Sequence, residues 1–182
     1  MDGLILSDAW VIFDNPRSKN ALLGFAQSSV NSSYFWFVFF SLSHYCSTKP
    51  NIRNRSHEGK FIELQFKTRA IPCITELHSL FYVNKVKVIP ASIYDLLTPV
   101  ALAHWIMGDG SYHSGLILST DSFSIPDIVK LMNVLIIRYR VECTIHKYSG
   151  RPRIYIPSRF KNTIRSLVFP YMHPSMLYKL GL

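Results

Sequence analysis

The sequence predicts an α+β protein built from one structural unit that occurs twice. The first observation is a short apolar helical phrase with an aspartate as its next-to-last residue, at residues 3–9 and again at residues 102–110. The second is the order of segments after each aspartate, where apolar runs alternate with Asn, Pro or Gly turns as they do in β-hairpins. The third is a shared ending, Pro-x-x-x-Tyr-x-Leu, which begins at Pro90 and at Pro174. Each half therefore reads helix, hairpin, helix, hairpin, helix.

Residues 1–97 make up the predicted N-terminal half. Its apolar segments predict a first hairpin, a helix, a second strand pair and a final helix, at residues 10–29, 33–46, around 60–67, and 72–82. The aromatic run Tyr34–Phe40 is far shorter than the roughly 18 residues that span a bilayer. Its continuous apolarity favours a buried core helix over a surface on which bases stack.

Residues 98–182 repeat this order. The corresponding segments are a hairpin, a helix, a second hairpin and a final helix, at residues 111–122, 126–140, 142–156 and 158–168. Pro126 suits the first turn of the first of these helices, and Ser124 is its predicted N-cap.

The charge of the chain favours a polyanionic partner. Lys and Arg number 20 against 11 Asp and Glu, which gives a net charge of +9. No Gly-rich phosphate loop, Ser-His-Asp set or cofactor fingerprint is present, which disfavours an enzyme acting on small molecules. Neither a signal peptide nor a membrane-spanning segment is expected.

Asp8 and Asp109 are the next-to-last residues of the two repeated phrases. A single aspartate at a helix end is usually a solvated surface acid, but two at matched positions of a repeat favour a shared metal site. Small residues four positions apart, such as Gly3 and Ser7, let two such helices approach closely. In a basic chain, paired carboxylates predict metal-assisted chemistry on a phosphodiester.

Several stretches of the chain carry a resemblance to a known family. They are Tyr94–Pro99, Trp105–Gly110, Thr120–Ser122, Pro170–Met172 and Pro174–Leu180. With the two aspartate phrases, they resemble the LAGLIDADG homing endonucleases, in the single-chain, two-motif form encoded in mitochondrial group I introns. The resemblance covers essentially the whole chain. It implies a pseudo-twofold duplicated αββαββα fold with central motif helices, and two antiparallel sheets that form a DNA-binding saddle.

The resemblance also implies an activity and a set of site residues. The activity is site-specific cleavage of both strands of double-stranded DNA by a monomer that uses Mg²⁺, or alternatively Mn²⁺. The implied metal-site residues are Asp8, Asp109, Ala9 and Gly108. A mitochondrial location follows from the resemblance as well.

Other residues are expected to assist cleavage. Gln27 lies at the strand position that the family uses for a water-ordering polar group, and Thr120 is its counterpart. Lys67 or Arg69 would approach the scissile phosphate, with Arg159 or Lys161 corresponding in the other half. The alternative for each of these cations is a solvated strand end.

Further cations lie in the hairpin tips and loops, where they would contact DNA phosphates. They are Arg17, Lys19, Arg53, Arg55, Lys60, Lys147, Arg151, Arg153 and Arg159.

One departure from the family keeps other functions open. Ala9 follows Asp8 where the family usually has glycine. Either a left-handed helix end there costs alanine about 1 kcal/mol, or the helix ends differently and shifts Asp8. One alternative is a maturase that binds group I intron RNA and assists its splicing. The other is a cleavage-inactive protein that binds nucleic acid on the same scaffold.

Overall fold

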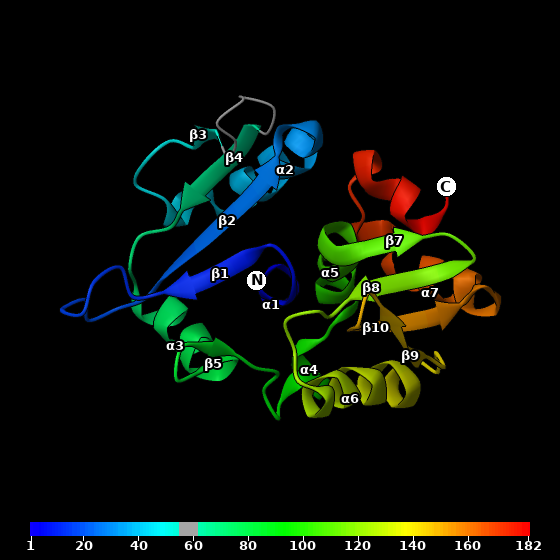
Figure 1. Cartoon of the computed structure of the whole chain (residues 1–182). Coiled ribbons are helices and arrows are strands. Elements are labelled where there is room, and N and C mark those ends of the chain that lie inside the picture. The colour runs from blue at the N-terminus through cyan, green and yellow to red at the C-terminus, as the bar shows by residue number, and fades with distance from the viewer. Residues whose placement is uncertain (55–61) are drawn as a thin grey trace. The chain divides into compact units, whose positions relative to one another are not determined.

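The structure is a computed structural model that describes residues 1–54 and 62–182. The chain divides into two compact units, one of residues 8–79 and the other of residues 1–7 together with 80–182. Each unit contains a four-stranded antiparallel sheet (Figure 1). The predicted halves, 1–97 and 98–182, stay a prediction beside this division.

The sheet of residues 8–79 has the strand order β1-β2-β4-β3. Its strands are β1 (Ala9–Ile12), β2 (Leu22–Ser28), β3 (Asn51–Asn54) and β4 (Ile62–Lys67). Ala9 lies opposite Phe25, and Phe25 lies opposite Phe66, so these three side chains share one face of the sheet. All three are buried, which places the core of this unit on that face.

Helix α2 (Ser32–Leu42) covers the same face. Phe35 packs against Phe25 and Phe66 with ring centroids 6.0 and 5.7 Å apart. The predicted core helix is present, but only one side of it is buried, because Phe40 is 68% exposed. With 3.6 residues per turn, only one side of an α-helix can face a sheet, and the remaining aromatic residues lie on the other side.

The described residues of this unit contain three further, shorter helices. They are η1 (Ser29–Asn31), η2 (Ser43–Tyr45) and α3 (Pro72–Phe81), of which α3 runs across the boundary into the other unit.

The sheet of the other unit repeats the topology in the order β7-β8-β10-β9. Its strands are β7 (Gly110–Tyr112), β8 (Gly115–Ser119), β9 (Thr144–Tyr148) and β10 (Arg151–Pro157). Between β8 and β9 lie α6 (Ile125–Asn133) and its continuation η3 (Val134–Arg138). After β10 come η4 (Ser158–Phe160), α7 (Lys161–Val168), η5 (Phe169–Tyr171) and η6 (Pro174–Leu180). Ser124 caps α6 by accepting the Asp127 backbone N–H, as predicted. The duplicated α+β fold is therefore confirmed.

The two motif helices, α1 (Asp2–Leu6) and α5 (Pro99–Asp109), lie in the same unit and pack against each other. A Cβ atom placed on Gly3 would lie 2.0 Å from the Ala101 carbonyl oxygen. The absence of a side chain at Gly3 therefore allows the close backbone approach that the repeat predicts.

Two small elements link the repeated parts, and the sequence did not predict them. A short hairpin joins β5 (Tyr82–Val83) to β6 (Val86–Lys87) through Asn84 and Lys85, both with positive φ. Helix α4 (Ile93–Leu96) follows. In the described part of the chain, every helix is too short or too polar to cross a membrane.

Candidate functional site

Asp8 is anchored by a buried amide within the unit of residues 8–79. It lies between the end of α1 and the start of β1. The Gln27 amide nitrogen donates a hydrogen bond to an Asp8 carboxylate oxygen at 2.5 Å. The Gln27 oxygen in turn accepts from the Asn31 side-chain amide at 3.1 Å. This second bond orients the Gln27 amide, so that its nitrogen faces the carboxylate.

Two side chains close to Asp8 are buried from solvent. Gln27 is buried, and the neighbouring Tyr34 side chain is completely buried. Burial, and secondly the negative charge of Asp8, raise the pKa of the Tyr34 phenol far above its ordinary value. The phenol is therefore neutral at every physiological pH, and Asp8 supplies the negative charge of this cluster.

Asp109 is the last residue of α5, in the other unit. The Lys179 ammonium donates to the carbonyl oxygen of Gly108, the residue before it, at 2.6 Å. Arg153 on β10 makes two hydrogen bonds to the Asp121 carboxylate, at 2.9 and 3.0 Å. The pKa of Arg153 is raised, first by these bonds and to a smaller extent by the charge of Asp109. Asp109 thus lies in a cationic environment.

The strand registers show how the two halves correspond. Ala9 pairs with Phe25 and Gly110 pairs with Leu118, so Gln27 and Thr120 occupy the same register position. Their contacts nevertheless differ. The Thr120 hydroxyl is buried and donates to the Pro152 carbonyl oxygen at 2.8 Å. The two side chains therefore have equivalent positions in their sheets but different hydrogen-bond partners.

The register also corrects the predicted counterparts of Lys67 and Arg69. Phe66 pairs with Phe25 and Ile154 pairs with Leu118, which aligns Lys67 with Tyr155. The predicted match to Arg159 or Lys161 is wrong, because Arg159 lies beyond β10 in η4 and Lys161 begins α7.

The side chains of Lys67 and Arg69 have partners within their unit. The Lys67 ammonium lies 3.6 Å from an Asp14 carboxylate oxygen. The Arg69 guanidinium donates to the carbonyl oxygens of His44 and Tyr45, at the end of η2. Arg69 thus caps η2, a contact that the sequence did not indicate.

Six of the predicted phosphate-binding cations are exposed to solvent, namely Arg17, Lys19, Arg53, Lys147, Arg151 and Arg159. Arg151 lies 3.5 Å from Asp121, and Arg159 forms an ion pair with Glu142. Arg55 and Lys60 lie outside the described residues.

The sequence did not indicate a polar cavity in the unit of residues 8–79. The cavity measures about 80 Å³ and is lined by Thr48, Lys49, Asn51, Gln65, Phe66 and Lys67. Gln65 is 3% exposed, and its side-chain oxygen has no hydrogen-bond partner among the residues that the structure describes. Strand alternation could have placed Gln65 beside Lys67 on one face, whereas no sequence pattern pointed to Lys49.

Of the two expectations at Ala9, the left-handed penalty is wrong, and the helix ends in a different way. Gly110, the equivalent residue after Asp109, has φ −76°, and Ala9 is not among the residues with positive φ. The motif ends without a left-handed residue because the chain passes directly into a strand. Gly110 has a steric role instead, since a Cβ there would lie 2.5 Å from the Ile106 carbonyl oxygen.

The duplicated sheets, the packed motif helices and the repeated aspartate define the class of a two-motif LAGLIDADG protein. The sequence pattern described as the LAGLIDADG DNA endonuclease family matches residues 1–163, and the chain belongs to this family.

Named relatives fall into two functional groups. A cytochrome b mRNA maturase bI2 of Debaryomyces hansenii is 33% identical over all of this chain and 72% of its own length. An intron-encoded endonuclease ai4 of Dictyostelium discoideum is 30% identical over 80% of this chain and 98% of its own.

A solved structure agrees with this assignment. The homing endonuclease I-WcaI, bound to its DNA recognition sequence, is 28% identical, with a TM-score of 0.91 over 98% of this chain and 83% of its own. The family and its fold, both expected from the sequence, are thereby confirmed.

Proposed function

We propose that the chain is a site-specific DNA endonuclease of the intron-homing type, in which Asp8 and Asp109 hold divalent metal for cleavage of both strands. The observation that carries this proposal is the direct packing of α1 on α5 at Gly3, because each of these helices leads into one of the two aspartates. Membership in a DNA endonuclease family supports it.

The oxygen donors of the motifs suit Mg²⁺ or Mn²⁺. Asp109 offers a carboxylate beside the Gly108 carbonyl, and both are the hard ligands that Mg²⁺ prefers. In residues 1–54 and 62–182, no three His, Cys, Asp or Glu side chains gather into a metal cluster. One or two carboxylates, completed by water and phosphate oxygens, are a common Mg²⁺ environment. When bound, such a cation stabilises charge on the phosphodiester and lowers the pKa of a water ligand.

The other side chains have distinct proposed tasks. Gln27 holds the Asp8 carboxylate in a single orientation, with Asn31 fixing the amide. Arg153, held by Asp121 in the electrostatic field of Asp109, balances negative charge beside the second carboxylate. Exposed cations such as Arg17 and Lys147 bind phosphates of double-stranded DNA.

A maturase function is the second candidate, and the observation that favours it is the 33% identity to a named maturase along the whole chain. Such a protein would bind intron RNA through the same basic residues. A mitochondrial location is proposed with either function, since that relative is named for cytochrome b mRNA.

Selection of cut sites from a randomised duplex DNA library tests the endonuclease proposal. With Mg²⁺, the wild-type chain is expected to enrich one cleaved sequence. With Asp8→Asn plus Asp109→Asn, binding to that sequence should persist while cleavage disappears. Full cleavage by the double variant would contradict the assignment of these aspartates. A wild-type chain that cuts no DNA but binds a group I intron RNA selectively would favour the maturase.

A further inference from the structure

A lysine from a distant part of the chain donates a hydrogen bond to the C-terminal end of helix α5. The Lys179 ammonium donates to the Gly108 carbonyl oxygen at 2.6 Å, and Gly108 directly precedes Asp109. Lys179 lies in η6, near the C-terminal end of the described chain. Both residues belong to the same compact unit.

The electrostatics of a helix end explain why a cation is favourable here. The last carbonyl groups of a helix carry partial negative charge, and Asp109 adds a full negative charge at the same end. The last turn of α5 contains no basic residue of its own. Lys179 supplies the missing positive charge from outside the helix.

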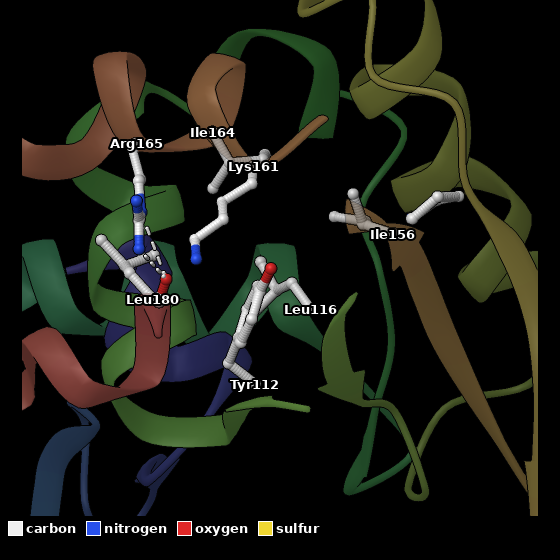
Figure 2. A pocket seen from close by; sticks show the side chains of 8 residues that line it. Tyr112, Leu116, Ile156, Lys161, Ile164, Arg165 and Leu180 are labelled. Atoms are coloured by element: carbon white, nitrogen blue, oxygen red, sulfur yellow. Dashed lines mark hydrogen bonds between the residues drawn. The ribbon is translucent and has the colours of Figure 1, made fainter. Parts of the chain in front are cut away.

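The segment that carries Lys179 is held firmly. The Arg165 guanidinium on α7 donates to the carbonyl oxygens of Leu180 and Gly181, at 3.0 and 2.7 Å. Figure 2 shows Arg165 next to Leu180, with Tyr112 and Lys161 facing the same small pocket. Leu180 is buried, and Gly181 adopts positive φ against the Tyr112 ring. These contacts therefore fix the position of the segment that carries the Lys179 ammonium.

We propose that the Lys179 ammonium and the catalytic divalent cation compete for the oxygens at the end of α5, which makes Lys179 a metal-responsive positioning residue. This inference rests on the proposed metal site at Asp109. Mg²⁺ binds oxygen at about 2.1 Å. An ammonium 2.6 Å from the same oxygen would lie within a few ångströms of that cation. Two positive charges so close repel each other, so occupancy by one weakens binding of the other.

The other motif helix offers an internal comparison. The Lys87 ammonium donates to the Ile5 carbonyl oxygen at 2.7 Å, near the end of α1. Ile5 lies three residues before Asp8, whereas Gly108 is adjacent to Asp109. Competition with a divalent cation is therefore expected to be weaker at Lys87 than at Lys179.

Metal binding by the full chain without DNA tests the proposal. Titration calorimetry with Mn²⁺ should give about tenfold tighter binding for Lys179→Met than for wild type, a typical size for coupling between two sites. Lys130→Met is the matched control, because Lys130 also donates to a backbone carbonyl, that of Ile89, at 2.7 Å. Its Mn²⁺ affinity should stay within about twofold of wild type, since that bond lies on another segment. Equal or weaker binding by Lys179→Met than by wild type would overturn the competition.

A second measurement needs no variant. Mg²⁺ should increase the labelling of Lys179 by an amine-reactive reagent in the wild-type chain, read by mass spectrometry, relative to Lys130. Labelling that is unchanged at saturating Mg²⁺ would also overturn the proposal.

The Asp109→Asn variant distinguishes failure of the proposed metal site from failure of the proposed role of Lys179. If this variant binds Mn²⁺ as wild type does, the metal role of Asp109 fails and the competition fails with it. If Asp109→Asn loses binding while Lys179→Met gains none, only the role of Lys179 is wrong.

Discussion

The Gln27 amide orients one of the two motif carboxylates through a hydrogen bond to Asp8. Its nitrogen faces Asp8 and its oxygen is held by Asn31, so removing the amide removes one hydrogen bond that orients the carboxylate. Loss of such a supporting hydrogen bond typically costs about 10- to 100-fold in activity. Gln27→Leu is therefore expected to reduce cleavage by this factor while DNA binding persists, measured on the selected duplex with each strand labelled separately.

Thr120→Val is the matched comparison for Gln27→Leu. Thr120 has the same register position, but its hydroxyl bonds to Pro152, so we expect a stability loss of about 1 kcal/mol and little effect on cleavage. Equal losses of cleavage in the two variants would show that the hydrogen bond to Asp8 is not the cause.

His104 is expected to make folding stability sensitive to acid. Burial, and secondly the N-terminal ammonium, lower its pKa from 6.5 to about 4. Between these values, the unfolded chain binds a proton that the folded chain does not, so stability is complete above pH 6.5 and falls as pH drops towards 4. The full loss is about 3 kcal/mol.

Urea unfolding at several pH values measures this effect. His104→Phe should flatten the pH dependence between 6.5 and 4, whereas His113→Gln, which removes an exposed imidazole, should leave it in place. An unchanged slope in His104→Phe would assign the acid sensitivity to other groups.

At the scale of elements, the contact between α1 and α5 depends on Gly3. Helix propensity alone predicts that Gly3→Ala stabilises the chain by about 1 kcal/mol. The added Cβ would instead meet the Ala101 carbonyl oxygen at 2.0 Å, so we expect a net loss of about 1–3 kcal/mol. Thermal unfolding gives the sign directly, and a raised melting temperature would show that the helices can separate without cost.

The order of elements was predictable because it follows from local patterns. The aspartate phrases, the turn residues and the Ser124 cap each act within a few residues, and the sequence shows them directly. Strand register was not predictable in the same way, because hydrogen bonds between distant strands determine it. The counterpart of Lys67 was therefore misplaced, and the capping role of Arg69 depends on a contact 24 residues away.

The site was predictable where the two halves repeat and unpredictable where they differ. Gln27 could be placed beside Asp8 because the family uses that strand position for a polar side chain. Thr120 has the equivalent position in the other sheet, but its hydroxyl donates to the Pro152 carbonyl oxygen. No residue near Thr120 in the sequence indicates this hydrogen bond. Lys179 likewise reaches Gly108 only through tertiary packing.

At the scale of the whole molecule, the net charge of +9 predicts DNA binding that depends strongly on salt. If about eight phosphates are neutralised, the slope of log affinity against log salt should be near −7. Lys147 is exposed on β9, so Lys147→Gln should make this slope shallower by about 0.9. Arg159 already pairs with Glu142, so Arg159→Gln should change it less. Fluorescence anisotropy at several salt concentrations measures both slopes, and an equal change in the two variants would show that the ion pair with Glu142 does not limit the contribution of Arg159.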